Sequence, residues 1–135
     1  MSGEKILVVD DEPDVVETVK FRLESDGYEV VTAADGFEAL GAARVHRPDL
    51  ILLDVMLPKE NGYRVSRLLR EDEDATGATR RTPIVLLTAR DLSGDAEREK
   101  MFMDFSRANL VIYKPFDLAE LVEVVERLLA ARPQA

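Results

Sequence analysis

Five short runs of apolar residues recur along the chain and are separated by mixed or polar stretches. They are Ile6–Val9, a weaker Tyr28–Val31, Leu50–Leu53, Ile84–Leu87 and Leu110–Tyr113. Three of these runs consist only of Val, Ile and Leu, which is typical of parallel strands buried on both faces. The pattern therefore predicts five strands, three of them covered on both sides.

Amphipathic stretches fill the intervals between these runs. Residues Val15, Val16, Val19 and Leu23 recur at helical spacing, with Pro13 near the helix start and Gly27 just past its end. Further helices are expected at about Phe37–His46, from near Asn61 onward and at about Gly94–Phe105. A strict alternation of strands and helices predicts right-handed crossovers and an α/β fold, a doubly wound parallel sheet with helices on both sides.

The last helix carries the clearest signals. Asp117 is in position to cap it, and Glu120 completes a capping box. An apolar stripe follows at Leu121, Val122, Val125, Leu128 and Leu129. We therefore predict a fifth helix that packs one face against the sheet.

The sequence pattern gives less direct information about two segments, residues 71–81 and the fourth predicted helix. Residues 71–81 begin with four acids, Glu71–Asp74, and end with Arg80 and Arg81, and we interpret them as a solvated helix end and loop. The fourth predicted helix carries Met101, Phe102, Met103 and Phe105. We interpret these mainly as core facing the sheet, with a partner-docking face as the alternative.

Composition narrows the class of protein. A length of 135 residues is typical of one domain. Of these residues, 46% are hydrophobic and 33% are charged. The absence of cysteine removes disulfides, thiolate catalysis and cysteine-bound zinc. A net charge of −9 argues against a surface for nucleic acid or anionic membranes. No apolar stretch near the N-terminus is long enough for a signal peptide or membrane span, so a cytoplasmic location is the default expectation.

Polar residues stand at the carboxyl ends of the predicted strands, where parallel α/β sheets collect their ligands. They are Asp10, Asp11, Glu12, Asp54, Thr88 and Lys114. Carboxylates that converge there would repel one another without a cation, and oxygen ligands on a partly open site suit Mg²⁺. A lysine ammonium and a threonine hydroxyl suit phosphoryl oxygens. The set indicates phosphoryl transfer to a carboxylate nucleophile.

Four segments resemble the signature segments of the receiver domains of two-component response regulators, in the family's order and over essentially the whole chain. They are Val8–Glu12, Asp54–Gly62, Leu87–Ala89 and Tyr113–Phe116. The resemblance implies a flavodoxin-like fold with strand order 2-1-3-4-5. It also implies that residues 1–135 form a single receiver domain, with no room in this chain for an output domain. Whether the domain acts alone or belongs to a larger protein stays open.

The resemblance also assigns roles to individual residues. Asp54 is implied to be the phosphoacceptor, and Mg²⁺ is implied to bind Asp10, Asp11, Asp54 and the backbone carbonyl of Met56. Thr88 and Lys114 are implied to contact the phosphoryl group, and Pro115 is expected to follow a cis peptide bond. Gly62 is interpreted as a backbone requirement of the loop before the third helix.

One position departs from the family pattern. Receivers usually carry an aromatic residue three positions before the conserved lysine, and that position is Val111 here. Tyr113 lies two residues later, on the same side of the predicted strand. We hypothesise that Tyr113 replaces the usual aromatic switch imperfectly, or that the output does not use an aromatic rotamer.

The expected function is a phosphorylation-driven switch that takes its phosphoryl group from a partner histidine kinase or phosphotransfer protein. Beyond assisting its own phosphorylation and dephosphorylation, it is not expected to be an enzyme. Its output is expected through protein contacts of the fourth helix, fifth strand and fifth helix, with a homodimer through the same face.

Three alternative functions fit the sequence less well. A phosphorylation-independent interaction module usually lacks an acid, the threonine or the lysine, and all are present here. An aspartyl phosphatase on a similar fold carries a second aspartate two residues after the nucleophile, where this chain has Met56. A flavin site would need a glycine- and hydroxyl-rich loop in place of Asp10–Glu12.

Overall fold

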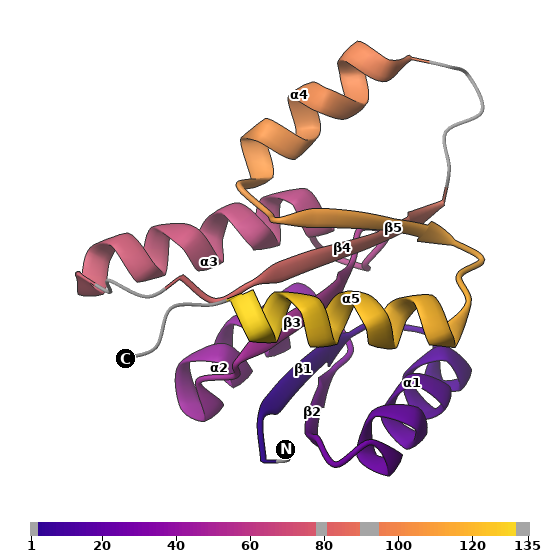
Figure 1. The fold of residues 1–135 in the computed structure, drawn as a ribbon. Helices are drawn as coiled ribbons and strands as arrows, with labels where there is room; N and C mark the ends of the chain where they lie inside the picture. The colour runs from indigo at the N-terminus through magenta and orange to yellow at the C-terminus, as the bar shows by residue number, and fades with distance from the viewer. Residues whose placement is uncertain (1–2, 78–80, 90–94, 132–135) are drawn as a thin grey trace.

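The structure, a computed structural model, describes residues 3–77, 81–89 and 95–131 (Figure 1). Its centre is a five-stranded sheet in the order β2-β1-β3-β4-β5, in which every neighbouring pair is parallel. The strands are β1 Lys5–Val9, β2 Glu29–Ala33, β3 Leu50–Asp54, β4 Ile84–Ala89 and β5 Leu110–Lys114. The predicted fold class and strand order are confirmed.

Five helices alternate with the strands. They are α1 Pro13–Ser25, α2 Gly36–His46, α3 Gly62–Thr76, α4 Ala96–Ser106 and α5 Leu118–Ala131. Local capping explains where several begin: the Asn61 side chain accepts a hydrogen bond from the amide of Arg64, and Asp117 accepts one from the amide of Ala119. The expected start of the fourth helix, Gly94, lies outside the described residues. Within the described ranges, no helix has the length and apolar character needed to cross a membrane.

The helices form a layer on each face of the sheet. Apolar side chains of α1 and α5, among them Val19, Leu23 and Leu121, pack with Ile6, Val8, Leu50 and Leu52 in one core. On the other face, Ala39 of α2 and Val65 and Leu69 of α3 pack with Leu7, Val9, Ile51 and Leu53. Because successive strand residues point to opposite faces, β1 and β3 have to be apolar almost throughout.

The four-acid run was interpreted correctly as a helix end but wrongly as a merely solvated one. Residues 71–76 are the last turns of α3, which ends at Gly77 with φ +71°, and residues 78–80 lie outside the described ranges. Each acid of the run pairs with arginine. The pairs are Glu71 with Arg67, Asp72 with Arg44, Glu73 with Arg70 and Arg81, and Asp74 with Arg81 and Arg107. This helix end is therefore tied to its neighbours rather than merely solvated.

The core interpretation of the α4 residues was also wrong for most of them. Met101 is 62% exposed and Phe105 40%, whereas Met103 reaches the core beneath α2 and α3. The ring of Phe102 stacks on Tyr63 of α3, with 5.0 Å between the ring centroids. Most of these side chains therefore lie against α3 or in solvent, not between the helix and the sheet.

Candidate functional site

Three ionisable side chains come from the carboxyl ends of three strands and point to the same face of the sheet. Asp10 follows β1, Asp54 ends β3 and Lys114 ends β5. The residue two positions before each is Val8, Leu52 or Ile112, and all three belong to the core under α1 and α5. Side chains two positions apart in a strand share a face, so each polar group lies on the same face as the apolar residue before it. The three polar groups thus lie together at the carboxyl rim, the edge of the sheet where the strands end.

The three groups meet at the rim. The Nζ atom of Lys114 lies 3.1 Å from Oδ2 of Asp10, 3.4 Å from Oδ1 of Asp54 and 3.7 Å from Oε1 of Glu12. Asp10 and Asp54 are each only 2% exposed, whereas Asp11 is exposed. Carboxylate oxygens of Asp10, Asp11 and Asp54 all lie within 4.8 Å of one another. Lys114 therefore faces more negative charge than it can balance.

Burial and charge set the protonation of the site. Burial, followed by the charge of Asp10, raises the pKa of Asp54 from 3.8 to about 6, against the opposing effects of the Met56 amide and Lys114. Burial alone would lower the pKa of Lys114, but its bond to Asp10 and the charge of Asp54 raise it. A compact divalent cation with oxygen ligands fits this arrangement, because it would offset the charge that the single ammonium leaves unbalanced.

Backbone amides orient the two buried carboxylates. Oδ1 of Asp10 accepts a hydrogen bond from the amide of Glu12, and Oδ1 of Asp54 accepts one from the amide of Met56. The Nζ atom of Lys114 also lies near Oδ1 of Asp54, so the Met56 amide and Lys114 contact the same carboxylate oxygen. The Met56 side chain itself is 72% exposed, so this residue meets the site through its backbone.

The loop after β3 returns close to the backbone of Asp54. The Gly62 amide donates to the carbonyl of Val55 at 2.8 Å. A Cβ atom at position 62 would collide with the carbonyl oxygen of Asp54 and lie 2.6 Å from Cα of Val55. The loop therefore requires glycine at this position, which confirms the interpretation from the sequence.

Thr88 and Tyr113 lie side by side on neighbouring strands, where they pair in register. Thr88 is half-buried, and its hydroxyl contacts the carbonyl of Ala89 at 3.4 Å; among the described residues it makes no hydrogen bond to Asp54. The Tyr113 hydroxyl lies 3.4 Å from both carboxylate oxygens of Glu99 in α4. Val111 packs with the core on the α3 side of the sheet, so it shares a face with Tyr113 as expected.

The structure thus brings Asp10, Asp11, Asp54 and Lys114 together and leaves Thr88 and Tyr113 adjacent to them. The peptide bond from Lys114 to Pro115 is cis. The contact between Glu12 and Lys114 was missed from the sequence. The sequence signal for this contact was that Glu12 directly follows Asp10 and Asp11.

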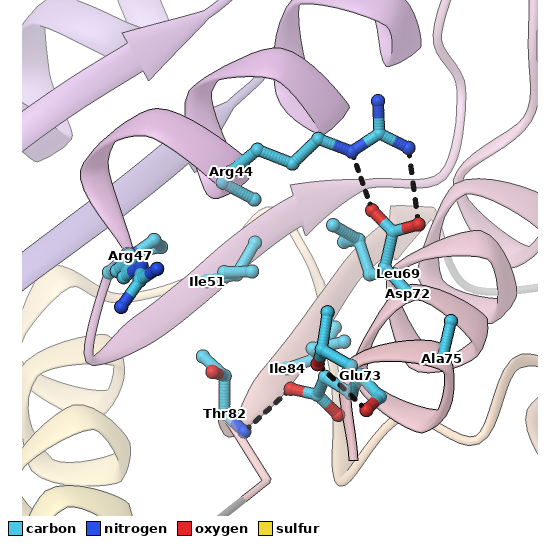
Figure 2. Close-up of a pocket in the computed structure, with 12 residues that line it drawn as sticks. Arg44, Arg47, Ile51, Leu69, Asp72, Glu73, Ala75, Thr82 and Ile84 are labelled. Carbon is cyan, nitrogen blue, oxygen red and sulfur yellow. Dashed lines mark hydrogen bonds and ion pairs between the residues drawn. The ribbon is translucent and has the colours of Figure 1, made fainter. Parts of the chain in front are cut away.

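A groove of about 680 Å³ lies away from this rim, at the amino ends of β3 and β4 (Figure 2). Ile51, Leu69 and Ile84 form its floor, and the ion pair of Arg44 with Asp72, 2.7 Å long, lies at its edge. A smaller hollow of about 350 Å³ beside α1 includes Asp10 and Asp11. The carboxylates and the lysine converge at the carboxyl rim, so we place the candidate site there.

Comparisons with known proteins agree with this geometry. The family model described as the response regulator receiver domain matches residues 6–126. The alkaline phosphatase synthesis transcriptional regulatory protein PhoP of Bacillus subtilis is 41% identical over 94% of this chain, which covers 49% of that protein. The polar-differentiation response regulator DivK of Brucella anthropi is 32% identical over 92% of this chain and 94% of its own length.

One solved structure that resembles this chain contains a bound metal ion. The receiver domain of sensor histidine kinase PA1611 from Pseudomonas aeruginosa, with a magnesium ion coordinated in its active site cleft, aligns with a TM-score of 0.80. It is 35% identical, over 96% of this chain and 100% of that domain. The chain spans about half the length of PhoP, the first of the curated relatives it matches. It belongs to the response regulator receiver domain family, the phosphoryl-accepting signalling switches of two-component systems.

Proposed function

We propose that Asp54 accepts the phosphoryl group, in a Mg²⁺-dependent reaction, from a histidine kinase or phosphotransfer protein. One observation carries the assignment: Asp54 is the buried carboxylate that both Asp10 and Lys114 face, with Lys114 Nζ at 3.4 Å. A buried acid in contact with a lysine and a second acid is the arrangement that phosphoryl transfer to a carboxylate needs.

The nucleophile is Oδ2 of Asp54, because the contacts with Met56 and Lys114 engage Oδ1. Oδ2 attacks the phosphorus of the donor phosphohistidine, a P–O bond forms, and the P–N bond breaks with its electrons passing to the imidazole nitrogen. Lys114 turns from Asp10 toward a phosphoryl oxygen and balances its charge. Thr88, on the strand next to β3, donates its hydroxyl to another phosphoryl oxygen.

The ligands proposed for Mg²⁺ are the carboxylates of Asp10, Asp11 and Asp54 and the backbone carbonyl of Met56. The close approach of three carboxylates, two of them buried, supports this set. When bound, the ion neutralises charge on these carboxylates and on the phosphoryl oxygens. Asp10 also positions Lys114 before the donor arrives.

The output is proposed to pass through α4, β5 and α5 to another protein, and the same face is proposed to pair two copies of the chain. Receiver domains interact with histidine kinases or phosphotransfer proteins. Size-exclusion chromatography with and without the phosphoryl mimic beryllofluoride tests the homodimer. A monomer in both conditions would rule it out.

Intact-protein mass spectrometry after incubation with acetyl phosphate tests the phosphoacceptor. The wild type gains one phosphoryl mass in Mg²⁺ and none in EDTA, and Asp54→Asn gains none. Asp104→Asn is the matched control, because Asp104 is an exposed acid on α4. Phosphorylation of Asp54→Asn, or of the wild type in EDTA, would overturn the assignment, and the same assay with phosphorylated kinases covers donors other than acetyl phosphate.

A further inference from the structure

The outer face of α2 carries an exposed apolar stripe with a gap in its middle. Phe37 is 72% exposed and Val45 is 76% exposed. Gly41 lies midway between them, four residues from each, and residues four apart share one face of a helix. A Cβ atom at Gly41 would meet no atom of the described residues on other elements within 4 Å. The stripe therefore has a large side chain at each end and none at its centre.

Two opposite charges flank the stripe. Glu38 and Arg44 are exposed and lie three positions before and three positions after Gly41. Oε1 of Glu38 accepts a hydrogen bond from the amide of Ala34 at 2.9 Å. Arg44 donates through Nε and Nη2 to the two carboxylate oxygens of Asp72. Contacts within the chain thus hold both charged side chains in place.

Each of these side chains keeps one polar atom free. Figure 2 shows the third nitrogen of the Arg44 guanidinium, Nη1, pointing away from Asp72. Among the described residues, neither this nitrogen nor Oε2 of Glu38 makes a hydrogen bond. Side chains that are already fixed lose little entropy when they bind a partner. One donor and one acceptor are therefore available on the same face as the apolar stripe.

This face is complementary to a second copy of itself. When two α2 helices cross antiparallel about a two-fold axis at Gly41, residues equally far from Gly41 on its two sides reach the same level. Phe37 then lies level with Val45 of the second copy, and Glu38 lies level with Arg44 of the second copy. Glycine at the crossing point lets the two backbones approach closely. Such self-complementarity is what an interface with two-fold symmetry requires.

We propose that the α2 face, defined as Phe37, Glu38, Gly41, Arg44 and Val45, binds a second copy of this chain in an antiparallel contact centred on Gly41. The contact uses no residue of the phosphorylation site or of α4, β5 and α5, so it forms without phosphorylation. Interfaces that bury less than about 1,200 Å² are typically weak, and one short helix makes a small interface. The pairing is therefore a weak, reversible dimerisation.

Sedimentation velocity of the full chain, from micromolar to millimolar concentration, tests the contact. The experiment is done in EDTA without a phosphoryl donor, which separates it from any dimer that depends on phosphorylation. The sedimentation coefficient of the wild type rises with concentration. Gly41→Gln adds a side chain at the crossing point and lowers the association constant at least tenfold, while the fold is kept because the position faces open space.

Removal of an exposed aromatic ring gives a matched pair of variants. Phe37→Ser lowers the association constant at least tenfold. Phe21→Ser is the control, because Phe21 is 75% exposed on α1 and lies outside the α2 face, so it associates like the wild type. A wild type that stays monomeric at millimolar concentration would overturn the proposal. Association that Phe21→Ser weakens as much as Phe37→Ser would also overturn it.

Exchange of the two charges tests the antiparallel arrangement. Glu38→Arg places two arginines level with each other at each end of the contact, and Arg44→Glu places two glutamates there, so neither variant associates with itself. An equimolar mixture restores association, because each pair then joins an arginine to a glutamate. Circular dichroism shows that both variants are folded. A mixture that stays monomeric, with both variants folded, would contradict the antiparallel pairing of Glu38 with Arg44.

Discussion

The Nζ atom of Lys114 lies 3.1 Å from Oδ2 of Asp10, although the two residues are 104 positions apart in the chain. Lys114 ends β5, an edge strand, whereas Asp10 follows β1, and β3 and β4 lie between these strands. The long side chain therefore crosses the end of β4 to reach two carboxylates. This lysine therefore offsets part of the negative charge of the two buried carboxylates.

Substitution of Lys114 should affect Mg²⁺ binding and phosphorylation in opposite directions. We expect Lys114→Met to bind Mg²⁺ about tenfold more tightly, because about 1.4 kcal/mol of charge repulsion between ammonium and metal is lost. Phosphorylation by acetyl phosphate should nevertheless slow, since a phosphoryl oxygen loses its partner. Titration calorimetry and mass spectrometry measure the two effects. Lys59→Met, which removes an exposed lysine paired with Asp35, should change neither.

The raised pKa of Asp54 makes metal binding depend on pH. Its pKa is about 6 in the folded chain and 3.8 without the surrounding structure. The ionised form is thus disfavoured by folding, and Asp54 makes the metal-free chain less stable as pH rises from below 3.8 through 6. Mg²⁺ needs the ionised form, so its apparent affinity should fall by up to about tenfold per pH unit below 6.

Melting temperatures with and without Mg²⁺ check this dependence. The increase caused by Mg²⁺ should be large at about pH 7.5 and small at about pH 5. In Asp54→Asn the part of the pH dependence due to this group should disappear. A shift of equal size at both pH values in the wild type would contradict the raised pKa.

Two glycines should respond oppositely to the same substitution. Gly62→Ala forces a Cβ atom onto the backbone of Asp54 and Val55, and should destabilise the fold by about 1–3 kcal/mol and slow phosphorylation. Gly41→Ala places a Cβ atom in open space in the middle of α2, and should stabilise by about 0.5–1 kcal/mol. Urea unfolding measures both changes. Equal changes in the free energy of unfolding for the two variants would show that the loop at Gly62 tolerates a side chain.

The neighbouring acids Asp72 and Glu73 should differ in their contribution to stability. Asp72 forms an exposed pair with Arg44, and Asp72→Asn should cost about 0–1 kcal/mol. Glu73 accepts bonds from buried Arg70, from Arg81 and from the amide of Thr82, so Glu73→Gln should cost about 1–3 kcal/mol. Both variants lose one negative charge, so a common charge effect cancels in the comparison. A larger loss at Asp72 would contradict the network at Glu73.

Much of the fold was predictable because its signals are local. Runs of Val, Ile and Leu mark β1, β3 and β4, since strands covered on both faces exclude polar residues. Pro13 and Asn61 mark helix starts, because a missing amide proton or a side-chain acceptor suits those positions. The site residues could be named because each directly follows, or ends, such a run.

Tertiary structure alone decided which of these residues meet and how deeply they are buried. Asp10 and Asp11 are identical neighbours in sequence, yet the first is buried against Lys114 and the second is exposed. The four acids at the end of α3 and the aromatic residues of α4 look like an ordinary solvated run and an ordinary core stripe. Their partners lie on other elements, so the ion pairs and ring contacts depend on how the helices pack. Local periodicity carries no information about that packing.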